Sequence, residues 1–134
     1  MNRLEKFKPL SLLLLRAALG VVFLYHGWPK LFGNTQVFLD SFARIGLPSW
    51  TAYVAGVIEL FGGALLLAGL FTRITGLVLT VHMCVALWKF HFSEGILAVR
   101  EYEFPLVLAA GALAFATTGA GLLSLDHLVF KEKA

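Results

Sequence analysis

Three ionisable side chains stand inside otherwise apolar stretches of the chain. Arg16 follows four leucines, Glu59 lies within AGVIELFGG, and His82 lies within LVLTVHMCVA. A charged group at membrane depth is energetically costly, and such groups are usually paired and functional. An acid, a histidine and an arginine brought together could relay protons. The same residues could equally form a buried ion pair that sets helix register.

A second group combines bases, an acid and aromatic rings near one end of the predicted helices. Its candidate ligand-binding residues are His26, Lys30, Tyr25, Trp28, Trp88 and Glu103. Basic side chains can donate hydrogen bonds to the carbonyl oxygens of a quinone or hold a small anion, and a titratable neighbour can supply protons. The alternative is a set of snorkelling side chains with an aromatic belt at the membrane surface.

Metal and disulfide chemistry are not expected. The four histidines lie in separate segments, without an HxxxH pair or a Glu-x-x-His repeat. Cys84 is the single cysteine, so the chain cannot form an internal disulfide. We therefore predict no metal or haem site, and the sequence carries no nucleotide-binding motif.

The composition indicates the surroundings in which these residues lie. Of the 134 residues, 59% are hydrophobic and 14% are charged, and the mean hydropathy is +0.83. A soluble domain of this length cannot hide so much apolar surface. The composition and the modest formal net charge of +3 disfavour a soluble enzyme and a nucleic-acid-binding module. We expect residues 1–134 to form a single membrane domain.

Four apolar segments are long enough to cross a membrane as helices. They cover residues 10–28, 50–70, 74–90 and 104–123. Pro29 is expected to end the first helix, and Pro105 to lie in the first turn of the fourth. Between the first two, Phe38, Phe42 and Ile45 recur at helical spacing, which predicts a short amphipathic helix in the membrane interface. The predicted fold is therefore an all-α integral membrane four-helix bundle.

Small residues and charged residues share the same helix faces. Two such stripes contain Arg16, Gly20, Phe23, Gly27 and Lys30 in the first helix, and Gly56, Glu59 and Gly63 in the second. Glycines on a stripe allow helix backbones to approach closely in lipid, so both stripes should face the bundle interior. Counted by helical rise, Arg16 lies about 5 Å from the depth of Glu59 and His82. The three side chains could therefore meet.

The basic residues predict the orientation of the chain. Four spans place both termini on one side, together with Arg3, Lys6, Lys8, Arg73, Lys131 and Lys133. The other side holds Lys30, Arg44, Lys89 and Arg100. Because cytoplasmic loops of membrane proteins carry an excess of Lys and Arg, both termini are predicted to be cytoplasmic.

Three ordered stretches of the chain match the pattern of a known family. They read LLLRAALGVVFLYHGWPKLFG (13–33), AGVIELFGGALLLAGLFTR (55–73) and TTGAGLLSLD (117–126). Together they resemble the DoxX family of small four-helix membrane proteins. The resemblance implies a four-helix bundle in the inner membrane of a bacterium. The wider family is similar to the membrane subunit of a thiosulfate:quinone oxidoreductase, which implies quinone as a possible cofactor.

These observations leave three functions open. In the first, the protein is a redox module that binds a quinone or small anion and acts with a partner oxidoreductase. Glu59, His82 and Arg16 would then relay protons, while His26 and Lys30 would bind the ligand. In the second, it is a non-catalytic accessory subunit of a larger membrane complex, and in the third it carries a small solute. The expected partners are membrane lipid and either another protein or a second copy of the chain, but not nucleic acid.

Overall fold

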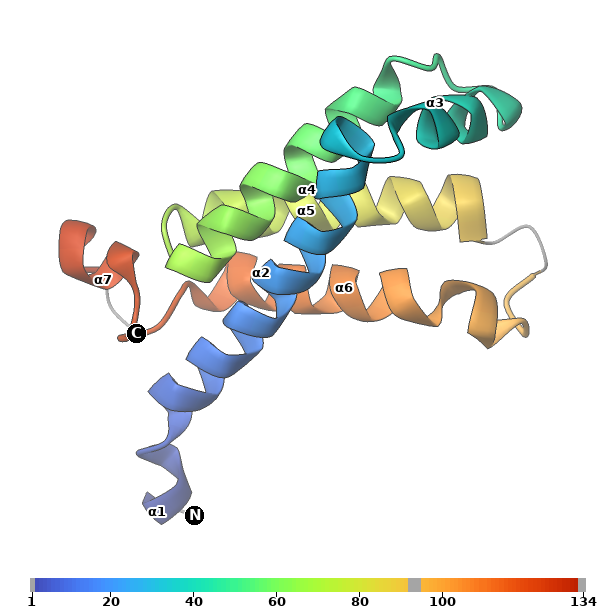
Figure 1. Ribbon diagram of the computed structural model, residues 1–134. Coiled ribbons are helices and arrows are strands. Elements are labelled where there is room, and N and C mark those ends of the chain that lie inside the picture. The colour runs from blue at the N-terminus through green and yellow to red at the C-terminus, as the bar shows by residue number, and fades with distance from the viewer. Residues whose placement is uncertain (1, 92–94, 133–134) are drawn as a thin grey trace.

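The protein is helical through most of the part that the structure describes. The computed structural model describes residues 2–91 and 95–132, without the side chains of Phe90 and His91. Its helices are α1 (Asn2–Glu5), α2 (Lys8–Phe32), α3 (Thr35–Arg44), α4 (Thr51–Ala68), α5 (Thr72–Ala86), the π-helical turn η1 (Leu87–His91), α6 (Val99–Thr118) and α7 (Leu125–Phe130) (Figure 1). No described residue belongs to a β-strand. The predicted all-α class is confirmed.

The four long helices form two closely packed pairs. The most extensive contacts in the molecule join α2 to α4 and α5 to α6. A Cβ at Gly20 would lie 2.8 Å from the carbonyl oxygen of Gly63 on α4. A Cβ at Gly76 on α5 would lie 2.6 Å from the carbonyl oxygen of Ala112 on α6. Glycine is needed at these positions because the two backbones touch, as expected for helix pairs in lipid.

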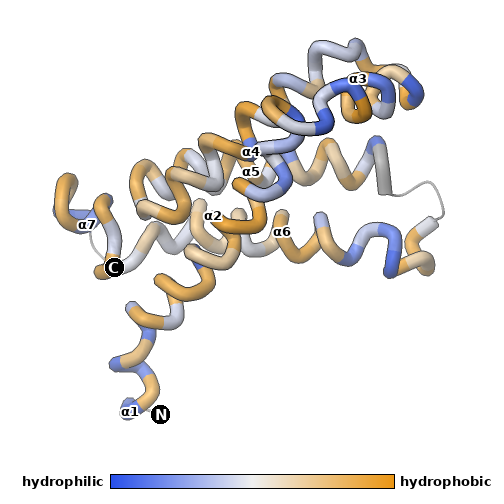
Figure 2. Tube along the Cα trace, in the orientation of Figure 1, coloured by the Kyte–Doolittle hydropathy of each residue, from blue (hydrophilic) through white to orange (hydrophobic). Residues whose placement is uncertain are grey.

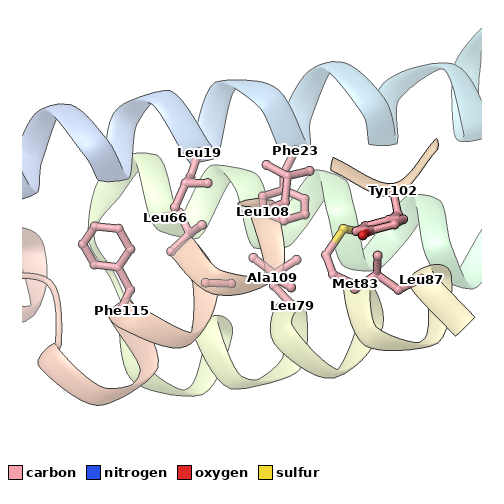
Figure 3. Packing of buried hydrophobic residues seen from close by; sticks show 11 residues of the cluster. Leu19, Phe23, Leu66, Leu79, Met83, Leu87, Tyr102, Leu108, Ala109 and Phe115 are labelled. Atoms are coloured by element: carbon pink, nitrogen blue, oxygen red, sulfur yellow. The ribbon is translucent and has the colours of Figure 1, made fainter. Parts of the chain in front are cut away.

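The two pairs meet in an apolar core. Figure 3 shows side chains from all four long helices meeting between the ribbons, including Leu19, Phe23, Leu66, Leu79, Leu108 and Phe115. Four of these residues, Phe23, Leu66, Leu79 and Phe115, are at most 1% exposed. This core holds the pairs together in the middle of the bundle. α4 and α6 diverge toward the end of the bundle at which α3 lies (Figure 1).

The amphipathic helix predicted between the first two spans is confirmed as α3. Phe42 is buried and Phe38 is half buried, and both pack in a cluster with Ala52 of α4. The opposite face of α3 carries Gln36 and Asp40, whose side chains form a 2.9 Å hydrogen bond at the surface. The apolar face of α3 therefore covers the diverging end of the bundle.

The outer surface of the long helices is largely apolar. Figure 2 shows hydrophobic residues along them, whereas hydrophilic residues gather at α1, on α3 and near the start of α6. Val21 of α2 and Phe61 of α4 are 55% and 61% exposed. By length and composition, α2 with 25 residues and α4 with 18 can cross a membrane. Exposing such an apolar surface to water costs free energy, whereas lipid tails can cover it without that cost.

The observed helix boundaries correct both predictions about proline. Pro29 does not end α2, which continues to Phe32. The carbonyl oxygen of Pro29 still accepts a hydrogen bond from the amide of Gly33, at 3.2 Å. Pro105 lies inside α6 rather than in its first turn, because α6 begins at Val99. A proline inside a helix removes one backbone hydrogen bond and crowds the preceding turn. Membrane helices tolerate this because neighbouring helices and local adjustments of the backbone compensate for the freed group.

The end of the chain also differs from the prediction. α6 ends at Thr118, before the predicted residue 123, because Gly119 adopts a φ of 79° that does not continue a helix. The short helix α7 then follows and was not predicted. Its N-cap is Ser124, whose side-chain oxygen accepts a hydrogen bond from the amide of His127 at 3.2 Å.

Candidate functional site

Lys30, Glu59 and His82 form a buried group that we call the ion-paired centre. Lys30 Nζ lies 2.6 Å from Glu59 Oε2, and His82 Nε2 lies 3.3 Å from Glu59 Oε1. The three side chains are 10%, 7% and 17% exposed, respectively. They come from α2, α4 and α5. One carboxylate thus joins an ammonium group to a titratable imidazole, which is an arrangement able to hold and move a proton.

Lys30 is held in place by three contacts. Besides pairing with Glu59, its Nζ donates a hydrogen bond to the carbonyl oxygen of His26 at 2.9 Å. The same atom lies 4.8 Å from the centre of the Phe38 ring, where a cation–π attraction is expected. A Cβ at Gly56 would lie 2.9 Å from Lys30 Cβ, so this glycine lets the lysine lie against α4. These partners make burial of the ammonium group possible.

A cavity of about 530 Å³ opens beside the ion-paired centre. This volume lies within the range of small-molecule sites in proteins. The polar residues that line the cavity are His26, Lys30, Ser41, Thr51, Glu59 and His82. The rest of the lining is apolar and includes Phe23, Phe38, Phe42, Met83, Phe104 and Leu108. The cavity therefore combines an apolar wall, formed by five helices, with a small set of hydrogen-bonding groups.

His26 adds a second imidazole to the cavity wall. Its ring packs against the ring of Phe104 on α6, with the centroids 5.2 Å apart. Among the described residues, no side chain or backbone group forms a hydrogen bond with its ring nitrogens. His26 can therefore offer a hydrogen bond to a molecule in the cavity.

Arg16 lies at the other end of the bundle and is 1% exposed. Its Nε, Nη1 and Nη2 atoms donate to the carbonyl oxygens of Leu66, Ala120 and Leu123, at 2.7, 2.6 and 2.9 Å. The guanidinium thus ties α2 to the end of α4 and to the segment between α6 and α7. Its planar set of donors suits this task, since it can reach three carbonyls at once.

Arg16 therefore does not join Glu59 and His82, a meeting that the sequence left possible, and it does not form the alternative ion pair with Glu59. Counting the depth of a residue from predicted helix ends takes no account of how two helices shift along each other. The close contact of Gly20 with Gly63 sets a different register, in which Arg16 lies beside the C-terminal end of α4. Lys30, fourteen residues further along α2, is the cation that reaches Glu59.

Asp126 completes the contacts at the Arg16 end of the molecule, and sequence reasoning gave it no role. Its carboxylate accepts hydrogen bonds from the amides of Phe71 and Thr72 at 2.7 and 2.8 Å, at the start of α5. Its own amide donates to the carbonyl oxygen of Gly69 at 2.8 Å. A carboxylate at a helix N-terminus satisfies free amides and complements the helix dipole. The chain end is thereby fixed to the turn between α4 and α5.

Four of the predicted ligand-binding residues do not line the cavity. Tyr25, Trp28 and Trp88 are 75%, 56% and 71% exposed, and Glu103 is exposed as well. The exposed aromatic rings match the alternative of an aromatic belt at a membrane surface. Of the second predicted group, only His26 and Lys30 contribute to the cavity.

Several cavity residues were missed by sequence reasoning. The sequence assigns Phe104 and Met83 only to apolar spans, and Phe38 and Phe42 only to an amphipathic helix in the membrane interface. The helical spacing of Phe38 and Phe42 did indicate a buried face, but not what that face covers. Only the packing of α3 on α4 shows that both rings help to enclose the cavity.

Comparison with known proteins supports a family assignment. The DoxX family pattern matches residues 11–92. A Bacillus subtilis protein named "Putative oxidoreductase CatD" is 36% identical over 130 residues, which cover 97% of this chain and 95% of the relative. The inner membrane protein YqjF of Escherichia coli is 28% identical over 133 residues, covering 96% of this chain and 99% of YqjF.

A more distant relative and the solved structures complete this comparison. The uncharacterized membrane protein Rv3486 of Mycobacterium tuberculosis is 30% identical over 137 residues, covering 92% of this chain and 84% of Rv3486. No solved structure matches the chain. The family pattern spans more than half of the chain, and the similarity to CatD extends over nearly all of it. The chain therefore belongs to the DoxX family of membrane proteins.

Proposed function

We propose that the protein binds a quinone in the cavity and takes part in its reduction or oxidation together with a partner oxidoreductase. The observation that carries this proposal is the ion-paired centre of Lys30, Glu59 and His82 in the wall of an otherwise apolar cavity. A quinone has an apolar ring and carbonyl oxygens that accept hydrogen bonds, so the cavity complements both parts. The oxidoreductase name of the Bacillus subtilis relative supports the same class of function.

The charges of the site favour a neutral ligand over a small anion. The ammonium of Lys30 is paired at 2.6 Å with the carboxylate of Glu59, which cancels its charge. A small anion would have to compete with that carboxylate inside an apolar wall, where an unpaired charge is costly. A quinone carbonyl needs only a hydrogen-bond donor, which His26 and His82 can supply.

The proposed chemistry assigns a task to each polar side chain. Reduction of a quinone to a hydroquinone consumes two electrons and two protons, and the partner oxidoreductase supplies the electrons by oxidising its own donor. His82 and His26 face the cavity and each can donate one proton to a ligand oxygen. Glu59 orients His82 through one carboxylate oxygen, while its other oxygen pairs with Lys30 and is held in place by it. Each turnover then requires both histidines to regain a proton, which comes ultimately from water.

The first test is purification of the protein from native membranes in mild detergent, followed by mass spectrometry of the lipids and proteins that remain bound. A retained quinone together with an oxidoreductase supports the proposal. A stable protein complex without quinone would contradict it and favour the accessory-subunit alternative instead.

A pair of histidine variants tests the proton-donating role. His82→Gln can still donate a hydrogen bond to Glu59 but cannot deliver a proton to a ligand. We expect quinone reduction by the purified complex to fall by about a hundredfold, which is typical for loss of a general acid. His127→Gln is the matched control, because His127 lies in α7 and its Nδ1 contacts the carbonyl oxygen of Glu132 at 2.8 Å. Equal activity of the two variants would contradict the role of His82.

A further inference from the structure

The cavity reaches the protein surface through apolar side chains. Three residues line the cavity and are also exposed: Val54 is 44% exposed, Val85 is 47% and Phe104 is 48%. The polar members of the lining, by contrast, are buried or half buried. The opening is thus apolar, and the hydrogen-bonding groups lie inside.

Two of these exposed residues lie on helices that contact each other, and we call the boundary between α4 and α5 the seam. Val54 lies on α4 and Val85 on α5, and each shares its helix with a member of the ion-paired centre, Glu59 or His82. The outer surface beside the seam is also apolar, with Val57 44% exposed. A molecule that enters beside Val54 and Val85 therefore meets apolar side chains at the opening and Glu59 and His82 inside.

From these observations, and resting on the proposed function, we infer that the site takes quinones with an isoprenoid tail directly from the lipid. The ring enters first and reaches the ion-paired centre, and the tail leaves the protein between Val54 and Val85. A cavity of about 530 Å³ can enclose the ring and the first part of a tail, but a long tail must extend outside it. An apolar opening stabilises that tail by keeping it out of water.

The seam can be closed by a single substitution with a matched control. Val85→Trp places a large ring at the opening, whereas Val78→Trp places the same ring two turns away on the same helix. Val78 is 45% exposed, close to the 47% of Val85, but it does not line the cavity. Any general effect of an added tryptophan in α5 is therefore shared by the two variants.

The experiment measures binding of two ligands to the full chain in lipid nanodiscs. The ligands are 2,3-dimethoxy-5-methyl-1,4-benzoquinone and the same ring carrying an isoprenoid tail. We expect Val85→Trp to weaken binding of the tailed ring by about tenfold, corresponding to the lost burial of roughly two methylene groups. Binding of the tail-free ring should change by less than about twofold. Val78→Trp should affect neither ligand.

Different results separate the failure of this inference from failure of the proposed function. If neither ring binds the unmodified protein, the proposed function fails and the inference fails with it. If both rings bind but Val85→Trp weakens them equally, or weakens neither, the quinone site stands and the tail path is wrong. Val54→Trp, on the opposite side of the seam, repeats the test should Val85→Trp fail to fold.

Discussion

Glu59 determines the electrostatics of the cavity because it contacts both nearby bases. Its two carboxylate oxygens are used separately, one by Lys30 and the other by His82. Because Lys30 and Glu59 are buried, removal of one of these two charges leaves the other without compensation in a medium that solvates it poorly. The stability of the site and its chemistry therefore depend on the same carboxylate.

Glu59→Gln should destabilise the protein strongly. The amide can still contact His82, but the ammonium of Lys30 loses its counter-charge, and breaking a buried pair typically costs about 3–5 kcal/mol. The free energy of unfolding, measured by denaturant titration in detergent micelles, should fall by that amount.

The double variant Lys30→Met with Glu59→Gln separates stability from function. Both charges are then absent, so most of the lost stability should return, while quinone reduction should remain low. Recovery of both stability and activity would show that the ion pair serves only the fold. Failure of the double variant to regain stability would show that the two side chains are not energetic partners.

Arg16→Lys tests a residue whose role is structural. A lysine ammonium cannot reach the three carbonyl oxygens that the guanidinium contacts, so we expect a loss of about 2–3 kcal/mol in the free energy of unfolding. Arg73→Lys is the control, because the Arg73 guanidinium also donates to backbone carbonyl oxygens, at the end of α6, but its side chain is 44% exposed. Water can replace those hydrogen bonds and screens the ion pair with Glu132, so we expect a loss below about 1 kcal/mol. Equal losses in the two variants would contradict the special position of Arg16. Arg16→Lys protein that remains folded should still bind quinone.

At the scale of the helices, glycines set how α2 and α4 fit together. A Cβ at Gly27 would lie 2.5 Å from the backbone nitrogen of Leu60 and 2.9 Å from the carbonyl oxygen of Gly56. Neither backbone atom can move without parting the two helices. The same register places Lys30 next to Glu59, so helix packing and the ion pair depend on one another.

Gly27→Ala should therefore lower both stability and ligand binding. We expect a loss of about 1–3 kcal/mol in the free energy of unfolding, as for other overpacked interiors. Gly111→Ala on α6 is the control, because the three atoms nearest to its Cβ all belong to the Leu19 side chain, whose end can shift more easily than backbone. Thermal unfolding of both variants in the same detergent provides the comparison. A Gly27→Ala protein as stable as Gly111→Ala would contradict the assigned α2–α4 register.

For the whole molecule, the apolar outer surface and the family place the protein in a membrane. The side chains that face outward from α2 and α4 are largely apolar, and the E. coli relative is named an inner membrane protein. α5 has 15 residues, and η1 extends it by five. We propose four spans, with the cavity on the side opposite the two termini.

Fusion reporters at the C-terminus test this orientation. The excess of Lys and Arg on the side of the termini predicts a cytoplasmic C-terminus. A green fluorescent protein fusion should then be fluorescent, and an alkaline phosphatase fusion at the same point should be inactive. The opposite pair of signals would overturn the orientation, and would place the cavity on the cytoplasmic side.

Local chemistry was sufficient to predict the class of the protein and four of the polar side chains that line the cavity. The long apolar runs, the amphipathic pattern around Phe38 and Phe42, and the glycine stripes could all be read from the chain because each depends on neighbours within a few turns. Glu59, His82, His26 and Lys30 stood out for the same reason, since a titratable group within or beside an apolar run is uncommon.

The ion-pair partner of each charged side chain could not be predicted from local sequence. Arg16 and Lys30 lie on one face of α2, about 21 Å apart along its axis, and either could have been the cation beside Glu59. The choice depends on the axial register of α2 against α4. The close backbone contacts at Gly20 and Gly27 set this register to within a fraction of a turn. Such a register is a property of two packed surfaces, so it exists only once the helices have come together.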